Sequence, residues 1–244
     1  MTIQQTLIIG ANSEIAKSIA IQQSLDTSIG LILISRKAIN EESLQGPQVS
    51  SFIVTDYSEH QIDQVISKLT LYENACITKV IICNGILHSS EIKPEKRIED
   101  FLPNAFNEVM QSNALTPMLW IKKLLPILTG KSPCKIAVFS ARVGSISDNR
   151  LGGWYSYRAS KAALNMMLKT AAIELARRDK NIKLLAFHPG TTDTPLSKPF
   201  QRNVPANKLF TSSYVAEQFL SIVEQLPFDQ KASYLDWQGK TIDW

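Results

Sequence analysis

Tyr157 and Lys161 lie four residues apart in the segment YSYRASKAALNMMLKTAAIELARR, which has the composition of a helix. In a helix this spacing places both side chains on one face, one turn apart. A free phenol has a pKa of about 10 and exchanges protons poorly at neutral pH, but an adjacent lysine cation stabilises the phenolate and lowers that pKa. The pair is therefore a candidate general acid and base. A half-buried tyrosine beside a solvated lysine would give the same spacing.

The start of the chain predicts a nucleotide site. A strand-like apolar run, TLII, is followed by Gly10 and then by a helical pattern over residues 14–25. A tight turn between a strand and a helix directs backbone N–H groups and the positive end of the helix dipole at one point. That arrangement suits a pyrophosphate.

Strand-like and helix-like segments alternate along all 244 residues, with no linker or low-complexity stretch between them. The predicted strands are 6–9, 31–34, 51–54, 79–83, 135–140, 182–187 and 232–236. The predicted helices are 14–25, 58–71, 103–125, 154–178 and 212–225. This alternation is typical of an α/β fold, a doubly wound parallel sheet with helices on both faces. We expect one domain, 1–244, in which 1–110 mainly binds a cofactor and 111–244 carries the catalytic residues.

Composition narrows the possible partners. The N-terminus has no basic segment followed by a long apolar stretch, and no apolar run approaches the ~20 residues that cross a bilayer, so we expect a cytoplasmic protein without a membrane partner. Cys76, Cys83 and Cys134 are odd in number and not spaced as metal ligands, which predicts neither a metal site nor a disulfide frame. The net charge of +4 is scattered in short pairs, which favours solvated helix faces over a nucleic-acid surface.

Several motifs in this order resemble the short-chain dehydrogenase/reductase family, in particular its C-factor-like or carbonyl-reductase-like branch. They are the turn at Gly10, the tripeptide CNG at 83–85, Asn113 in a helix, SARVGSI at 140–146, the Tyr157–Lys161 pair and HPGTTDT at 188–194. The resemblance covers essentially the whole chain and implies a Rossmann fold. It also implies an NADP(H)-dependent oxidoreductase that reduces a small carbonyl compound to an alcohol, or the reverse, and we expect a homo-oligomer, a dimer or tetramer.

In the mechanism that the resemblance implies, hydride passes from the nicotinamide to the carbonyl carbon while Tyr157 donates a proton to the oxygen. Lys161 lowers the pKa of the phenol and binds the nicotinamide ribose. Pro189, Gly190, Thr192 and Thr194 match the segment that meets the nicotinamide carboxamide. His188 is expected to be a strand-end histidine with satisfied hydrogen bonds rather than a base.

The glycine turn departs from the family pattern of glycine, three residues, glycine, any residue, glycine. Those places are Gly10, Glu14 and Ala16. A carboxylate in the first helical turn suits the helix dipole but repels a pyrophosphate. We expect Glu14 to point away and Asn12 and Ser13 to carry the phosphate cradle, with its effect on cofactor affinity left open. The other residues expected at the cofactor are Ile15, Asn84 and Gly85.

The end of the second predicted strand favours NADP over NAD. An NAD site would hold a carboxylate there for the ribose 2′-OH, but this chain has Ser35, Arg36 and Lys37. Arginine can bind a 2′-phosphate with two hydrogen bonds, and lysine adds a second charge. Asp56 matches the family position that meets the adenine ring, or equally caps the helix that starts near Ser58.

Asn113 shares a helix face with core residues, so its amide must find partners. Pro117, four residues later, has no N–H, so the carbonyl of residue 113 loses its helical hydrogen bond. The resemblance implies that this main chain holds a water in a proton relay from Lys161. A plain proline kink is the alternative.

The catalytic serine of the family is displaced. Aligning Gly144 with the family glycine puts that serine at Ala141, with Ser140 one residue earlier and Ser145 just after. Neighbouring side chains on a strand face opposite ways, so Ser140 needs a local irregularity to take the place of residue 141. We favour Ser140, with Ser145 or a site without serine as alternatives.

The stretch 191–211 is expected to be structureless and to act as a lid or substrate loop. Its Phe200, Phe210 and cations allow either an apolar or an anionic substrate. Trp237 and Trp244 are expected to be packing residues or subunit contacts. The alternative function is a nucleotide-sensing or signalling protein of the same fold with little or no turnover, which Glu14 and Ala141 favour.

Overall fold

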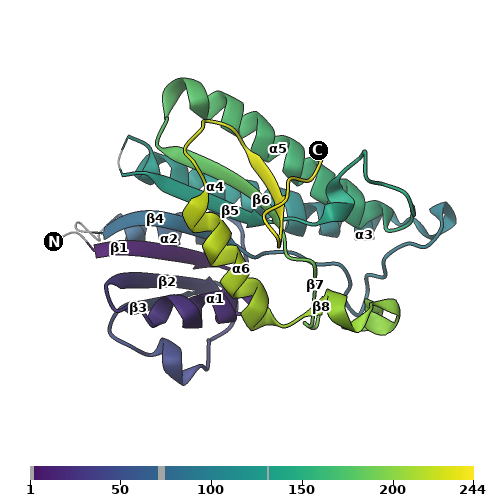
Figure 1. Cartoon of the computed structure of the whole chain (residues 1–244), viewed down its shortest axis with the longest axis horizontal. Coiled ribbons are helices and arrows are strands. Elements are labelled where there is room, and N and C mark those ends of the chain that lie inside the picture. The colour runs from purple at the N-terminus through teal and green to yellow at the C-terminus, as the bar shows by residue number, and fades with distance from the viewer. Residues whose placement is uncertain (1–2, 71–74, 131) are drawn as a thin grey trace.

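The computed structural model describes residues 3–70, 75–130 and 132–244 (Figure 1). Its main sheet has seven strands in the order β3-β2-β1-β4-β5-β6-β9, and every neighbouring pair is parallel. The strands are β1 (Ile3–Ile9), β2 (Ile29–Ser35), β3 (Val49–Ile53), β4 (Ala75–Ile82), β5 (Cys134–Phe139), β6 (Ile182–His188) and β9 (Ser233–Asp236). The predicted doubly wound α/β fold is confirmed, with strand ends that differ from the prediction by a few residues.

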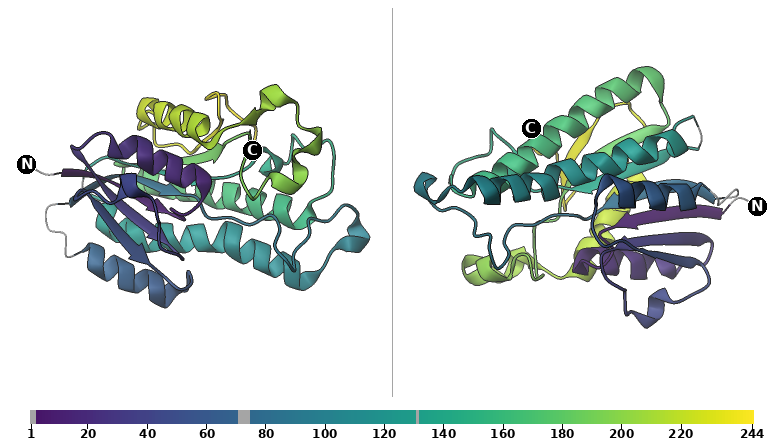
Figure 2. Two further views of the ribbon diagram at one scale, coloured as in Figure 1. Left: turned by 90° about the horizontal axis from the view of Figure 1, so that it is seen from below. Right: turned by 180° about the vertical axis from the view of Figure 1, so that it is seen from behind.

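Helices cover both faces of the sheet (Figure 2). On one face lie α1 (Glu14–Ser24) and α6 (Ser212–Gln225), which contact each other. On the other lie α2 (Glu59–Leu69), α4 (Thr116–Leu128) and α5 (Tyr155–Arg178). The predicted helix 58–71 extends into residues outside the described ranges. No helix among the described residues is both long and apolar enough to cross a membrane.

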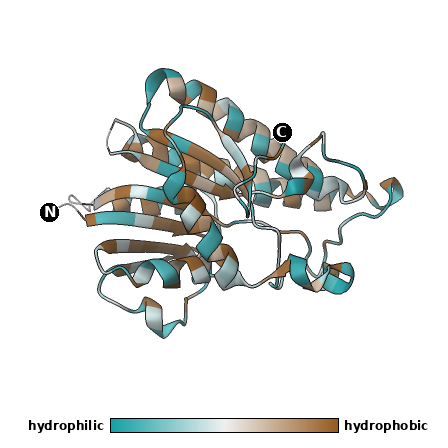
Figure 3. Ribbon diagram, viewed as in Figure 1, coloured by the Kyte–Doolittle hydropathy of each residue, from teal (hydrophilic) through white to brown (hydrophobic). Residues whose placement is uncertain are grey.

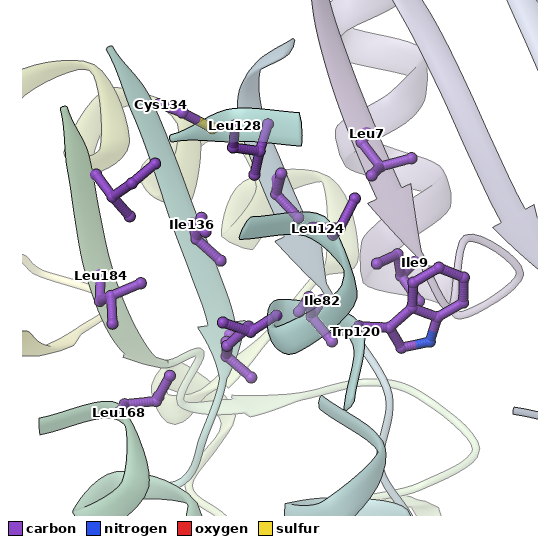
Figure 4. Packing of buried hydrophobic residues seen from close by; sticks show 14 of the residues in the cluster. Leu7, Ile9, Ile82, Trp120, Leu124, Leu128, Cys134, Ile136, Leu168 and Leu184 are labelled. Atoms are coloured by element: carbon purple, nitrogen blue, oxygen red, sulfur yellow. The ribbon is translucent and has the colours of Figure 1, made fainter. Parts of the chain in front are cut away.

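The continuous apolar strands explain this layering, because alternate side chains enter different cores. On β1, Leu7 and Ile9 join the core beneath α2, α4 and α5, whereas Ile8 joins the core beneath α1 and α6. Figure 3 shows the strands as the most apolar part of the ribbon. In Figure 4 the fully buried Trp120 of α4 lies beside Ile9 and Ile82, so the central strands and α4 share one core.

The predicted helix 103–125 is interrupted. It consists of α3 (Pro103–Met110), a π-helical turn (Gln111–Leu115) and α4, which continues to Leu128. Pro117 cannot donate a hydrogen bond, and the backbone N–H and hydroxyl of Thr116 both turn to the carbonyl of Gln111. The proline is thus accommodated by a wider turn that contains the buried Asn113, rather than by a kink alone.

The prediction of a structureless stretch at 191–211 is wrong. Strand β7 (Thr191–Thr192) pairs in parallel with β8 (Leu209–Phe210), and two short 3₁₀ helices, Lys198–Asn203 and Ala206–Lys208, lie between them. The segment bonds to itself, because the N–H of Asp193 donates to Phe210 O and the Ser197 hydroxyl donates to Thr192 O. Three other 3₁₀ turns are Glu42–Leu44, Ile98–Asp100 and Arg142–Gly144.

The carboxyl ends of β1, β4, β5 and β6 face one edge of the sheet, on the right of Figure 1. The segments that follow β4, β5 and β6 gather there. The strands β2 and β3 lie on one side of β1, and the strands from β4 onwards are added on its other side. Open parallel sheets bind ligands outside the strand ends at the point where the strand order switches in this way. This edge is therefore where the predicted site residues should meet.

Candidate active site

The turn after β1 forms the floor of the site. Gly10 has a φ of 76°, and a Cβ there would lie 3.1 Å from the carbonyl carbon of Cys83 and 3.2 Å from the nitrogen of Asn84. Only glycine allows this close approach of β1 to β4. Ser13 caps α1 by accepting from the N–H of Ala16, so the positive end of the helix dipole faces the turn.

Two adjoining cavities, of about 350 and 580 Å³, lie along this turn and share Asn12, Ser13, Asn84 and Gly85. The Oδ1 atom of Asn84 is buried and has no hydrogen-bond partner among the described residues, and the same holds for the Oγ1 atom of Thr192. Buried polar atoms require partners, and a dinucleotide carries many donors and acceptors. The glycine cradle, the helix terminus and the unpaired amide oxygen together fit NAD(P).

The unusual Glu14 lines the smaller cavity, but its carboxylate is turned along the helix. It forms an ion pair with Lys17, 3.0 Å away. The pair is largely exposed and contributes little stability. Its consequence is electrostatic, since the lysine compensates the charge that would otherwise repel a phosphate.

The larger cavity is lined by Ser35, Arg36 and Lys37 and, among its described lining residues, by no acidic side chain. The Arg36 guanidinium lies 5.8 Å from the centre of the Tyr57 ring. Sequence analysis missed Tyr57, although an aromatic residue just after a strand at this edge was a usable signal. The larger cavity thus presents the cations Arg36 and Lys37 where the adenosine ribose of NAD(P) would lie.

Asp56 lies outside both cavities. Its Oδ1 accepts the N–H of Ser58 at 2.8 Å, and hydrogen bonds from Ser58 hold the pKa of Asp56 below its usual value. Ser58 in turn caps α2. The cap of α2 is therefore Ser58, and Asp56 only positions that cap, so the prediction that Asp56 caps the helix is wrong and its adenine contact stays a prediction.

Tyr157 and Lys161 are both buried on the first turns of α5, at 9% and 3% exposure, and both line the smaller cavity. The Lys161 Nζ donates to the carbonyl of Phe139 at 2.8 Å and lies 5.8 Å from the centre of the Tyr157 ring. The two side chains thus lie on one face of α5 and line the same cavity, and their catalytic role stays a prediction.

The sequence predicts that Lys161 lowers the pKa of Tyr157, and this prediction is wrong for the arrangement in the structure. Burial, followed by the neighbouring Tyr234, raises the pKa of Tyr157, and burial lowers the pKa of Lys161 to about 8. The ammonium is directed at the Phe139 carbonyl rather than at the phenol, so desolvation outweighs its attraction for a phenolate. Tyr157 is consequently a firmly protonated donor.

Asn113 locks the segment after β4 onto α5. Its Oδ1 accepts the Ile86 N–H at 2.7 Å, and its Nδ2 donates to Ile86 O at 2.8 Å and to the Ser160 hydroxyl oxygen at 3.0 Å. A Cβ on Gly85 would lie 3.3 Å from Asn113 Oδ1 and 3.5 Å from Lys161 Nζ, so these groups crowd one place. The proton relay through its main chain stays a prediction.

Ser140 lines the cavity beside Tyr157, whereas Ser145 does not. Ser145 is held in its own loop by Ser147 Oγ and the Asp148 N–H. The Ser140 hydroxyl donates to Asn165 Oδ1 at 2.6 Å, while Asn165 Nδ2 is buried without a partner.

A hydroxyl has one proton, so Ser140 can donate to a substrate either by giving up its hydrogen bond to Asn165 or with the Asn165 amide rotated by half a turn, which exchanges its oxygen and nitrogen. In that orientation Nδ2 would donate to Ser140 and free its proton. Asn165 was missed from the sequence, although its position four residues after Lys161 on the same helix face was a signal.

Part of the segment 189–194, which is predicted to meet the nicotinamide, lines the smaller cavity. Pro189 and Thr194 line the smaller cavity together with Pro195 and Leu196, which sequence analysis missed. Gly190 has a φ of 73°, and a Cβ there would meet the Phe210 ring at 2.7 Å. The prediction that His188 has satisfied hydrogen bonds is wrong, because its Nδ1 is buried and finds no partner in the part of the chain that the structure describes. Burial lowers the pKa of His188 to about 4, so the ring is neutral.

The predicted packing role of the C-terminal tryptophans is confirmed. The Trp237 ring lies 4.2 Å from that of Phe210, and the Trp244 ring lies 5.3 Å from that of Tyr234. Across the described residues, no group of three or more His, Cys, Asp or Glu side chains is arranged to hold a metal ion.

Comparisons with known proteins agree with this geometry. The sequence profile described as short chain dehydrogenase matches residues 4–205. The C-signal protein of Myxococcus xanthus is 30% identical over 132 residues, which are 54% of this chain and 74% of that protein. The benzil reductase of Bacillus cereus is 24% identical over 245 residues, 92% of this chain and 95% of that enzyme. Two other curated relatives are matched over 57% of their own length.

A crystal structure of a short-chain dehydrogenase/reductase from Burkholderia multivorans with bound NADP has the same fold, with a TM-score of 0.82. It is 20% identical, and the match covers 99% of each chain. At this identity the likeness concerns the fold.

The buried lysine predicts a pH-dependent stability. The pKa of Lys161 is about 8 in the folded protein against 10.5 in the unfolded chain, so between these values the unfolded chain binds more protons and the free energy of unfolding rises with pH. From pH 8 to pH 10 the wild type should gain about 2 kcal/mol relative to Lys161→Met, as measured by urea denaturation. A difference that stays constant or shrinks over this range would contradict a desolvated ammonium at this position.

Proposed function

The chain belongs to the short-chain dehydrogenase family, and we propose that it transfers hydride between NADP(H) and a small carbonyl or alcohol substrate. The observation that carries this proposal is the shared cavity, in which Tyr157, Lys161 and Ser140 lie beside the glycine turn of the nucleotide site. A pure nucleotide-binding protein has no need for a buried phenol and ammonium at that place.

The residues of the chain supply proton transfer and orientation. When bound, NADP(H) supplies the hydride that adds to the carbonyl carbon. Tyr157 gives its proton to the carbonyl oxygen as the C–O double bond becomes a single bond, and a phenolate remains until solvent returns a proton. Lys161 is largely cationic below pH 8 and stabilises that phenolate once its Nζ turns from the Phe139 carbonyl. Pro195 and Leu196 exclude water from one side.

Carbonyl reduction, rather than another reaction of the family, is supported by the relative that matches over nearly the whole chain, whose name is benzil reductase. The preference for NADP is supported by Arg36 and Lys37 in the larger cavity. The NADP bound in the Burkholderia structure supports the same choice.

A second candidate is a nucleotide-sensing or signalling protein with little turnover. It is favoured by one specific observation, that the Ser140 hydroxyl donates to Asn165 while Ala141 occupies the usual serine position. The name of the C-signal relative points the same way.

NADPH oxidation measured against a panel of aldehydes, ketones and quinones separates the two candidates. Saturable oxidation with at least one carbonyl compound, abolished by omitting that compound, is the result expected of the enzyme. A protein that binds NADPH yet oxidises it with none of the panel would favour the sensor.

Cofactor preference should depend on Arg36. Arg36→Asp removes a charged phosphate contact and adds repulsion, so NADPH affinity should fall roughly 10- to 100-fold while NADH affinity stays the same or improves. Fluorescence titration of both cofactors measures this. The matched control is Arg97→Asp, an exposed arginine outside both cavities, which should change neither affinity. Unchanged NADPH affinity in Arg36→Asp, or tighter NADH binding by the wild type, would refute the assignment.

A further inference from the structure

Helix α5 begins without a capping side chain of its own. The residue before it, Trp154, has a φ of 54° and a ψ of 44°, in the left-handed region that is strained for a bulky residue. Its indole is a donor only, so it cannot accept from the first turn. The first N–H groups of a helix find no acceptor within the helix. Ser13 and Ser58 supply one in α1 and α2, whereas in α5 another segment of the chain does so.

Glu95, in the segment between β4 and α3, supplies these acceptors. Its backbone oxygen accepts the N–H of Trp154 at 2.6 Å. Both of its carboxylate oxygens lie 3.3 Å from the backbone nitrogen of Ser156, and one of them also accepts the Ser156 hydroxyl. The carboxylate thus lies at the positive end of the dipole of a 24-residue helix, where a negative charge is favoured.

A cap of this kind is costly, because the carboxylate is buried. Glu95 is 4% exposed, and among the described residues the hydrogen bonds to its carboxylate come from Ser156. Burying a carboxylate away from water is unfavourable unless its oxygens are paired. A serine or an aspartate at position 154 would cap the helix without that cost. The distant carboxylate does something that a local cap would not do, since it joins α5 to the segment after β4.

Tyr157 lies between two contacts with that segment. One residue before it, the contact is the one made by the Glu95 carboxylate. Three residues after it, the hydroxyl oxygen of Ser160 accepts from the Asn113 amide, which is bonded in turn to the main chain of Ile86. The turn of α5 that carries the phenol is therefore tied at both ends to the segment after β4.

The segment that makes these contacts is also part of the cofactor site. Its first residues, 83–85, line both cavities. Its approach to the start of α5 is close, because a Cβ on Gly153 would lie 3.3 Å from the backbone oxygen of Glu95. Arg158 Nε donates to Gly153 O at 2.9 Å and holds this turn against the helix. Releasing Glu95 would therefore free the start of α5 from the wall of the cofactor cavity.

We propose that Glu95 is a positioning residue for Tyr157: its carboxylate caps α5 from a distant segment and fixes the phenol against the cofactor cavity. The inference rests on the proposed function, because the position of the phenol matters to turnover only where Tyr157 transfers a proton. Glu95 is not among the described residues that line either cavity, so it acts through the helix. Misplacing a reacting group by about 1 Å lowers turnover on the order of 10²-fold.

Steady-state kinetics and NADPH titration of three variants test this role. Glu95→Ala removes the cap and should lower kcat about 10- to 100-fold, with KM and the Kd for NADPH within about threefold of the wild type. Glu95→Gln keeps an acceptor oxygen for the Ser156 N–H and should retain kcat within about fivefold. Ser156→Ala loses only the hydroxyl contact and should lower kcat roughly 2- to 10-fold.

Two control variants separate positioning from stability. Ser58→Ala removes the side-chain cap of α2 and should lower Tm without lowering kcat. Glu91→Ala removes an exposed carboxylate of the same segment and should change neither. Hydrogen–deuterium exchange adds a readout that needs no substrate: the amides of 155–160 should exchange on the order of 10-fold faster in Glu95→Ala and at the wild-type rate in Ser58→Ala.

Normal kcat in a folded Glu95→Ala protein would overturn the proposal. So would a Glu95→Gln protein as slow as Glu95→Ala, since the amide keeps the acceptor that the cap needs. Should Glu95→Ala not fold, Ser156→Ala decides, and normal kcat with normal exchange at 155–160 would overturn the role. Should the wild type reduce no carbonyl compound, the proposed function fails separately. Faster exchange at 155–160 in Glu95→Ala would then support the cap, and unchanged exchange would overturn it.

Discussion

The burial of the Lys161 ammonium against the Phe139 carbonyl is the constraint around which the site is organised. This contact joins α5 to the end of β5, and Gly144 packs closely against the main chain of the same lysine, since a Cβ on Gly144 would lie 2.8 Å from the carbonyl carbon of Lys161. Among the described residues no carboxylate is bonded to this cation, and burial lowers the pKa of Lys161 to about 8. Burial disfavours a phenolate at Tyr157, so the phenol stays protonated in this arrangement, and the Lys161 ammonium would lower the cost of a phenolate only after leaving the Phe139 carbonyl.

The rest of the site follows from how α5 is held. Its N-terminus is fixed by the Glu95 carboxylate at Ser156, and its first turns are fixed by Asn113 through Ser160. Glu95 lies in the segment that follows β4 at the carboxyl edge of the sheet, and Asn113 lies in the π-helical turn. The same anchors that orient Tyr157 also force Trp154 into its strained conformation.

The sequence predicted what depends on periodicity and short motifs: the alternation of strands and helices, the turn at Gly10 and the helix face shared by Tyr157 and Lys161. It did not predict what depends on distant contacts. Glu95 is 61 residues from its partner Ser156, and no local pattern marks it. The rise in the pKa of Tyr157 results from burial by other segments, and the pairing of β7 with β8 spans a loop whose composition suggested no structure. The hydrogen bond from Ser140 to Asn165 joins residues that are 25 apart in the sequence, and no local pattern marks it.

The central claim is that Tyr157 is the proton donor, and a single hydroxyl tests it most directly. Tyr157→Phe should keep the thermal stability and the NADPH affinity of the wild type and lower turnover on a confirmed carbonyl substrate about 10²–10⁴-fold. Tyr155→Phe, two residues earlier and 38% exposed, should leave turnover unchanged. Near-normal turnover in Tyr157→Phe would contradict the account and would assign the proton to another group of the cavity, such as Ser140 or Lys161.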